Sequence, residues 1–523
     1  MNVLSKNNSK IAEKINDLEI RKEEISLGGG IDKIERQHKA GRLTARERLD
    51  LFFDPGTFVE LDSFGKSLGK DFGVDKMNLP GDGVIIGYGK VDGRSVAAMA
   101  QDYTSLAGTM GEMHGRKIVK ITKLAGKWKI PIVGFNESAG ARLQEFLEIS
   151  RTYGEWFYYT SIHSGTIPQI AVMSGVVAGG QSYQPGLSDF IFMTKDSSAF
   201  IAGPPLVEAV TGEKVTSEEL GGAQMHSNVS GVCHVVTEDD VDAINGVKNL
   251  LSFLPSNYSQ KPLRMEGGDD PYRTCESLYD VIPENPKIPY DMHDVITELV
   301  DNGEIFEIHR DYAKSMIVGL ARFDGYSTGI IANNPKYLAG AIDVCAAEKA
   351  ARFIRFCDAF NIPLLYLTST PAYVVGSVQE KLGMIYRGAT LLHATSEATV
   401  PKVTVITGWA YAGAYIAMGS QYLGSDVVYA WPNAEIGLVA SEGVINVIYR
   451  KEIAAAKDPK AERKRREEEF RAKYMKIYYP ASYQHVDDII DPKDTRLMII
   501  KALEALQNKD QKLPPKKHGN MPL

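Results

Sequence analysis

Cysteine is scarce in this chain. Its 523 residues include four cysteines, and no two of them form a CxxC pair. The number excludes a disulfide framework, and the spacing excludes a zinc ribbon. We expect four reduced and mostly buried thiols in a reducing compartment, and therefore a cytoplasmic protein. The four residues are Cys233, Cys275, Cys345 and Cys357.

An excess of positive charge is also absent. Lysine and arginine together number 59 and aspartate and glutamate 66, which gives a net charge of −7 at pH 7. A mildly acidic chain binds nucleic acid poorly, so we expect no nucleic-acid partner. The first residues contain no apolar signal core.

One uncharged segment is long enough to cross a bilayer, Val403–Ser425. It contains four glycines and several hydroxyl and amide side chains. We therefore interpret it as a buried strand, a tight turn and a buried helix, and we expect no direct insertion into a membrane.

Several motifs of common enzymes are missing. The sequence has no GxxxxGK[ST] phosphate loop, no GxGxxG after a strand, no HExxH and no GxSxG. Their absence disfavours a phosphate loop, a dinucleotide fold, a zinc hydrolase and a nucleophile elbow. The ten histidines show no ligand spacing, so we expect no metal in this chain.

The chain contains an internal repeat. Asp92-Gly93 and Asp324-Gly325 each separate two apolar runs, which predicts two β-hairpins 232 residues apart. A helix followed by a buried strand recurs at the same offset. We predict an α/β fold with two tandem domains, 1–260 and 261–523, and a linker at Pro255–Asp291.

Two glycine turns carry the clearest chemical signal. Gly175 to Gly180 and Gly408 to Ala414 each follow a strand-like run and precede a helix. Backbone N–H groups at such a turn can face a developing oxyanion. The alternative explanation is close packing of the backbone. Paired oxyanion stabilisers without an obvious nucleophile or metal favour enolate chemistry on a thioester, with the base supplied by a cofactor.

The chain resembles the carboxyltransferase (β) subunit of biotin-dependent acyl-CoA carboxylases, above all propionyl-CoA carboxylase. It is also similar to the carboxyltransferase subunits of biotin-dependent decarboxylases. The resemblance covers nearly the whole chain and rests on an ordered set of short motifs, namely Gly41–Leu49, Gln101–Gly115, Glu137–Glu145, Glu218–Ala223, Glu348–Phe353, Gly413–Tyr415 and Pro514–Asn520.

The resemblance implies two crotonase-like (ClpP/crotonase) domains in a homohexamer, with acyl-CoA on the first domain and biotin on the second. It implies that the N–H groups of Gly179 and Gly180 hold the enolate oxygen of acyl-CoA. Those of Gly413 and Ala414 would hold the ureido oxygen of biotin. The carboxyl group would pass from carboxybiotin to the α carbon of propionyl-CoA or acetyl-CoA.

The same resemblance assigns further residues. Ala141 and Arg142 fall in the loop that contacts coenzyme A, and Ile416 occupies a position that helps to select the acyl chain. Isoleucine there resembles enzymes that take both acetyl-CoA and propionyl-CoA. The alternative for Ile416 is a core aliphatic. The sequence Ser369–Tyr373 departs from the family's Asp-x-Pro-Gly-Phe loop, and Ala412 replaces the first glycine of Gly-Gly-Ala.

The sequence shows no biotinylation site, because Met475-Lys476 is followed by Ile477 in a charged helix. Biotin would then arrive on a separate carrier protein, with a biotin carboxylase as a further partner. Three alternatives stay open. They are the carboxyltransferase subunit of a methylmalonyl-CoA-type decarboxylase, a non-catalytic paralogue that only builds the hexamer, and a crotonase-type hydratase or isomerase.

Overall fold

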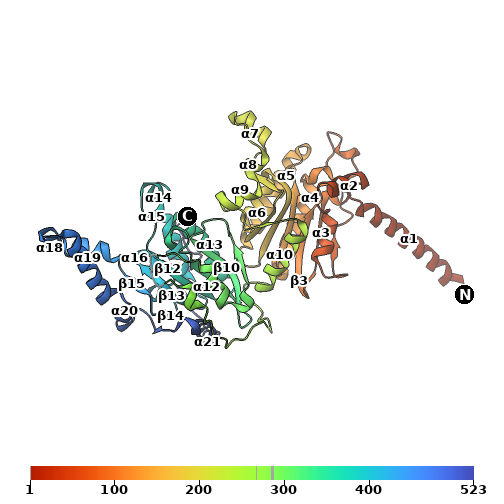
Figure 1. Cartoon of the computed structure of the whole chain (residues 1–523). Helices are drawn as coiled ribbons and strands as arrows, with labels where there is room; N and C mark the ends of the chain where they lie inside the picture. Colours follow the sequence, from red (N-terminus) through yellow and green to blue (C-terminus); the bar gives the residue numbers. More distant parts are fainter. Residues whose placement is uncertain (1, 267, 284–287, 523) are drawn as a thin grey trace. The chain divides into compact units, whose positions relative to one another are not determined.

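A computed structural model describes residues 2–266, 268–283 and 288–522. The chain forms two compact units (Figure 1). Unit 1 comprises Met1–Ser252 with Ser256–Tyr258, and unit 2 comprises Phe253–Pro255 with Ser259–Leu523.

Unit 1 is built on one mixed sheet with the strand order β1-β2-β3-β4-β5-β6-β8, and β7 pairs with β5. The first three strands are antiparallel, and the strands from β3 onward are parallel. The strands are β1 (Val59–Leu61), β2 (Val84–Val91), β3 (Arg94–Gln101), β4 (Ile132–Ser138), β5 (Gln169–Ala178), β6 (Phe190–Thr194), β7 (Ser198–Phe200) and β8 (Val235–Thr237).

Unit 2 repeats this topology strand for strand, with the order β9-β10-β11-β12-β13-β14-β16 and with β15 paired to β13. The predicted α/β repeat is therefore confirmed. The strands are β9 (Ile305–Ile308), β10 (Met316–Phe323), β11 (Tyr326–Asn333), β12 (Leu364–Thr370), β13 (Lys402–Tyr411), β14 (Val427–Ala430), β15 (Glu435–Gly437) and β16 (Asp488–Ile489).

Helices cover both sheets. In unit 1 they are α1 (Asn2–Ser26), α2 (Ile31–Lys39), α3 (Ala45–Phe52), α4 (Glu112–Trp128), α5 (Phe146–Ile162), α6 (Tyr183–Leu187), α7 (Pro204–Thr211), α8 (Ser217–Gly221), α9 (Ala223–Met225) and α10 (Asp240–Phe253). In unit 2 they are α11 (Leu278–Val281), α12 (Met292–Leu299), α13 (Val344–Ala359), α14 (Ser377–Lys381), α15 (Met384–Glu397), α16 (Ala412–Ala417), α17 (Ser441–Ile448), α18 (Arg450–Ala455), α19 (Pro459–Phe470), α20 (Tyr478–Ser482) and α21 (Thr495–Ala505).

Both predicted hairpins are confirmed. Each turn places an aspartate at φ 49–50° and a glycine at φ 75–78°, the pair of left-handed residues that a type I′ turn needs. A distant carboxylate caps each turn. Asp54 accepts hydrogen bonds from the N–H groups of Asp92 and Gly93, and Asp301 accepts them from those of Asp324 and Gly325.

Two expectations need correction. The segment Pro255–Asp291 is more than a linker, because Cys275 and Leu278 lie in the core of unit 2 and Cys275 donates its N–H to the carbonyl of Lys493. The charge pattern of Lys451–Lys476 predicts one helix, but the segment forms α18, α19 and a π-helical turn over Arg471–Met475, with a break between residues 455 and 459. The uncharged segment Val403–Ser425 does form a strand and a helix, β13 and α16, as predicted.

A buried lysine recurs in both units. Lys117 on α4 donates to the carbonyls of Gly81 and Val84, and Lys349 on α13 donates to those of His309 and Tyr312. Burial lowers the pKa of Lys117 to about 8 and that of Lys349 to about 7. Each lysine Nζ thus holds the chain segment that leads into the first long strand of its sheet.

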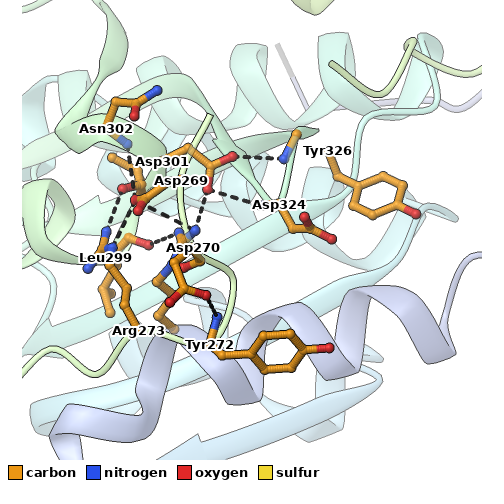
Figure 2. Close-up of polar contacts among 12 residues, drawn as sticks. Asp269, Asp270, Tyr272, Arg273, Leu299, Asp301, Asn302, Asp324 and Tyr326 are labelled. Atoms are coloured by element: carbon orange, nitrogen blue, oxygen red, sulfur yellow. Dashed lines mark hydrogen bonds and ion pairs between the residues drawn. The ribbon is translucent and has the colours of Figure 1, made fainter. Parts of the chain in front are cut away.

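A buried ionic cluster holds the hairpin turn of unit 2 (Figure 2). The fully buried guanidinium of Arg496 contacts the Asp301 carboxylate at 2.6 Å and donates to the Leu299 carbonyl at 2.8 Å. The same carboxylate caps the turn at Asp324-Gly325. Arg496 on α21 therefore connects the C-terminal helix to the β10–β11 hairpin.

We predict that Arg496→Ala lowers the free energy of unfolding of unit 2 by about 3–5 kcal/mol, because it leaves the Asp301 carboxylate buried without a cation. Arg465→Ala is the matched control, since Arg465 forms ion pairs with Glu462 and Glu469 but is half exposed. The control should cost about 1 kcal/mol or less. Denaturant unfolding of both variants measures the difference, and equal losses would contradict the prediction.

The buried lysines predict a pH dependence. The folded state holds the pKa of Lys349 at about 7, below its ordinary value of 10.5, so the unfolded chain binds more protons between these two pH values. Stability from this group therefore rises with pH across that window, with a slope approaching about 1.4 kcal/mol per pH unit. Subtracting the unfolding free energies of Lys349→Met from those of the wild type at each pH should give this slope. A difference that is flat from pH 7 to pH 10 would contradict it.

Candidate functional site

The predicted oxyanion residues lie at one kind of strand–helix junction in each unit. β5 continues to Ala178, and Gly179 then adopts φ 64° at the start of a short 3-10 helix. β13 continues to Tyr411, and Ala412 adopts φ 55° at the start of α16. The N–H groups in the first turn of a helix have no acceptor within that helix. Gly179, Gly180, Gly413 and Ala414 all lie in such first turns.

The turns begin later than the sequence suggested. Gly175 and Gly408, at which the sequence predicts the two glycine turns to start, lie inside β5 and β13. A Cβ atom on Gly175 would lie 2.5 Å from the Glu137 carboxylate, and one on Gly408 would lie 2.6 Å from the Ser369 hydroxyl. For these two glycines the close-packing explanation is the right one.

Strand pairing gives the register between the two junctions. Val176 faces Ser198 at the start of the β5–β7 pairing, and Trp409 faces Glu435 at the start of the β13–β15 pairing. Counting on from these residues equates Gly179 with Ala412 and Gly180 with Gly413. Ala414 is thus equivalent to Gln181. The two predicted N–H pairs are offset by one residue, and both include the Gly180/Gly413 position.

A buried ionic cluster supports the junction of unit 1. The Glu137 carboxylate at the end of β4 is fully buried and contacts Arg48 at 2.8 Å, Arg42 at 3.4 Å and the amide of Gln37 at 2.7 Å. Arg48 also pairs with Asp240 at 3.0 Å. The motif at Gly41–Leu49 therefore acts as a structural clamp on the strand next to β5.

Arg142 is not available to a ligand through its side chain. Its buried guanidinium contacts Asp82 at 2.5 Å and Glu145 at 2.9 Å, and it donates to the Thr109 carbonyl at 3.0 Å. The neighbouring Ala141 is half-buried and bridges Met110. Any contact of Arg142 with coenzyme A would therefore come from its backbone.

The altered loop of unit 2 keeps the backbone bonds of its counterpart. In unit 1 the Met110 N–H donates to Gly140 and the Arg142 N–H donates to Met110. In unit 2 the Ile342 N–H donates to Ala372 and the Val374 N–H donates to Ile342. The sequence change at Ser369–Tyr373 therefore leaves the path of the loop intact.

A polar network next to Gly180 was missed by sequence reasoning. The Gln101 amide N–H₂ donates to Gln181 at 2.9 Å and lies 3.3 Å from Nε2 of His114, and the Gln181 amide donates to the Tyr153 hydroxyl at 3.1 Å. Burial holds the pKa of His114 well below its usual value, so this imidazole is neutral. These residues come from four separate elements, and no local motif links them.

Ile416 lies on α16, half-buried against a cluster that includes Ile406, Val428 and Ile436. Its position is two residues beyond the Gly413-Ala414 turn. The packing accounts for an aliphatic residue here, and its role in selecting the acyl chain stays a prediction.

Unit 2 also contains a cavity of about 790 Å³ beside β12 and β13. Its lining includes Tyr290, Ser369, Thr407, Trp409 and Asn433.

Within the described ranges, no group of three or more histidine, cysteine, aspartate or glutamate side chains could hold a metal ion. No helix in the same ranges combines the length and apolar character that a bilayer crossing requires.

The left-handed backbone conformation of Ala412 predicts how glycine substitutions in α16 change the stability of unit 2. A left-handed alanine costs about 1–2 kcal/mol, and the greater freedom of glycine in the unfolded chain offsets about 0.4–1 kcal/mol. Ala412→Gly should therefore stabilise unit 2 by about 0.5 kcal/mol. Ala414→Gly, two residues later in the same helix at ordinary φ, should destabilise it by about 0.5–1 kcal/mol. Thermal unfolding of the two variants tests the opposite signs, and a loss in both would contradict the prediction.

Comparison with known proteins gives a consistent family. Residues 36–521 match the model of the carboxyl transferase domain. The chain is 48% identical to the methylmalonyl-CoA decarboxylase subunit alpha of Propionigenium modestum over 98% of this chain and 99% of that protein. It is 46% identical to the propionyl-CoA carboxylase carboxyltransferase subunit of Haloferax mediterranei, again over 98% and 99%.

A solved structure supports the fold. The transcarboxylase 12S crystal structure, described as a hexamer assembly with methylmalonyl-CoA and methylmalonic acid bound, matches with a TM-score of 0.95 and 44% identity over 97% of this chain and 98% of that one. This match confirms the two-domain carboxyltransferase architecture, and together the comparisons confirm the resemblance drawn from the motifs. The chain therefore belongs to the carboxyl transferase domain family, in the group of biotin-dependent acyl-CoA carboxyltransferases.

Proposed function

We propose that this chain transfers a carboxyl group from carboxybiotin on a separate carrier protein to the α carbon of propionyl-CoA or acetyl-CoA. The observation that carries the proposal is the duplicated junction. Each unit presents first-turn N–H groups after a left-handed residue at the end of an equivalent strand. A transfer between two bound groups, each with a developing or resident oxyanion, needs two such sites.

In this proposal the N–H groups of Gly179 and Gly180 hold the thioester oxygen while it becomes an enolate. Those of Gly413 and Ala414 hold the ureido oxygen of biotin. Biotin, when bound, supplies the carboxyl group and the nitrogen that takes the α-proton. The polar side chains next to Gly180 are Gln181 and Tyr153, and burial raises the pKa of Tyr153, so neither acts as a base at neutral pH.

The junctions fit a neutral ureido group and a thioester better than they fit a charged ligand. The polar partners around Gly180 are amides and a phenol. The ring of Tyr373 lies beside Gly413. The arginine that the resemblance had assigned to the ligand, Arg142, is paired inside the fold.

We further propose a homohexamer that works with a biotin carboxylase and a biotin carrier in the cytoplasm. Large apolar side chains are exposed around both loops, with Leu143, Phe146 and Leu147 in unit 1 and Val375, Val378 and Ile385 in unit 2. Exposed apolar patches of this kind mark surfaces that pack against other chains. The related 12S structure is described as a hexamer assembly.

Two other functions remain as candidates, and the experiment described below distinguishes them from the proposed transfer. The similarity to the methylmalonyl-CoA decarboxylase subunit alpha favours a decarboxylase complex as the second candidate. A non-catalytic paralogue that only builds the hexamer is the third.

The purified chain should decarboxylate malonyl-CoA and methylmalonyl-CoA when free biotin is supplied, and it should not do so without biotin. Release of the carboxyl group as CO₂ measures both rates. No biotin-dependent turnover by the assembled chain would contradict the proposed transfer and favour the paralogue. A membrane-bound partner in the native complex would favour the decarboxylase.

Ile416→Asp should raise the ratio of the methylmalonyl-CoA rate to the malonyl-CoA rate, because the resemblance associates aspartate at this position with a preference for propionyl-CoA. Ile489→Asp is the matched control, because Ile489 packs against the same core cluster from β16. Both variants place a carboxylate in this cluster, so a change of ratio in the Ile416 variant alone identifies a selector. Equal ratios in both variants would reduce Ile416 to a core residue.

A further inference from the structure

A tyrosine ring lies against the equivalent glycine in each unit. Ring carbons of Tyr153 lie 2.8 Å from the place where a Cβ atom on Gly180 would be. Ring carbons of Tyr373 lie 3.8 Å from the corresponding place on Gly413. Since strand pairing equates Gly180 with Gly413, both junctions have an aromatic wall at the same backbone position.

The two tyrosines are not copies of each other. Tyr153 belongs to α5, whereas Tyr373 belongs to the loop after β12. The loop residue equivalent to Tyr373 is Ala141, because Ala141 bridges Met110 as Tyr373 bridges Ile342. The repeat therefore has alanine at the loop position of unit 1 and tyrosine at that of unit 2.

The helix position shows the reverse exchange. The Thr160 carbonyl on α5 accepts from the side chain of Gln169, the first residue of β5, and the Thr395 carbonyl on α15 accepts from that of Lys402, the first residue of β13. This contact equates Thr160 with Thr395. Seven residues earlier, Tyr153 is then equivalent to Gly388.

Gly388 leaves the room that the loop tyrosine fills. A Cβ atom on Gly388 would lie 3.4 Å from the Tyr373 ring, and the Tyr373 hydroxyl donates to the Gly388 carbonyl at 3.2 Å. In unit 1 the Tyr153 hydroxyl accepts from the Gln181 amide. Each phenol is thus anchored by its hydroxyl, and burial raises the pKa of both, so the rings act as walls and not as acids.

We propose that Tyr373 is a specificity-determining residue that reserves the junction of unit 2 for the ureido ring of biotin. It closes the loop side of that junction, whereas Ala141 leaves the loop side of unit 1 open to a thioester and its coenzyme A. A flat ring beside Gly413 suits a compact planar ureido group. This inference rests on the proposed function of the two junctions.

Three variants test it, each assayed for biotin-dependent decarboxylation of malonyl-CoA with both substrates varied. Tyr373→Ala should raise the KM for free biotin about tenfold, as expected for one lost aromatic contact, and leave the KM for malonyl-CoA unchanged. Tyr373→Phe keeps the ring and should preserve both constants. Ala141→Tyr should raise the KM for malonyl-CoA about tenfold and leave that for biotin unchanged.

If Tyr373 had only a structural role, Tyr373→Ala would change the KM values for biotin and malonyl-CoA together, or would change neither. Either result would overturn the proposal. Thermal unfolding and the assembly size of each variant exclude a folding defect. Equilibrium binding of free biotin gives a second readout that does not need turnover. Weaker biotin binding by Tyr373→Ala than by the wild type and Tyr373→Phe supports the proposal. Equal binding by all three, or no binding by the wild type, overturns it. If the wild type binds biotin but shows no turnover, that result contradicts the proposed transfer but not the assignment of Tyr373.

Discussion

The fold depends on one backbone constraint, the left-handed residue that ends the central parallel strand of each sheet. Without it, β5 and β13 could not give way directly to a helical turn whose N–H groups stay unpaired. Glycine meets this constraint in unit 1 without steric cost, while unit 2 holds Ala412 at φ 55°. Such strain persists only where the surroundings enforce it, and here β13 is paired to β12 on one side and β15 on the other up to the last residues before the turn.

The two units stabilise the neighbourhood of this junction by different means. In unit 1 the end of β4 carries Glu137, whose buried charge is balanced by Arg48 and Arg42 from the N-terminal segment. In unit 2 the equivalent residue is Ser369, which is neutral and faces a cavity. A buried charge that is compensated on two sides is costly to change, so unit 1 is bound to its N-terminal segment. The neutral junction of unit 2 has no such dependence, and its loop could change sequence without losing its backbone bonds.

The features that were predictable from sequence are those with local signals. The hairpins follow from Asp-Gly between alternating runs, and the repeat follows from their spacing. The start of the junction was misplaced because Gly175 and Gly408 look like turn residues, and only pairing with β7 and β15 shows that the strands continue past them. The pairing of Arg142 with Asp82 and the contact of Tyr153 with Gly180 join residues far apart in sequence. No periodicity reports such contacts. The resemblance supplied the candidate residues, but the one-residue offset between the two N–H pairs required the strand register.

A duplicated domain that must bind two different ligands has to keep its backbone and change its side chains. The constraint on the backbone explains why the hairpins, their aspartate caps, the buried lysines and the loop hydrogen bonds all recur. Three of the differences lie where a ligand would meet each junction. Gln181 and Tyr153 in unit 1 correspond to Ala414 and Gly388 in unit 2, and Ala141 corresponds to Tyr373. Two positions that exchange a large residue for a small one, in opposite directions, preserve the packing volume while moving the open side of the site. A packed core tolerates a simultaneous exchange of this kind as long as the total volume is kept. The paired exchange beside the two oxyanion turns therefore satisfies the packing and at the same time gives the two junctions different open sides, as two different ligands require.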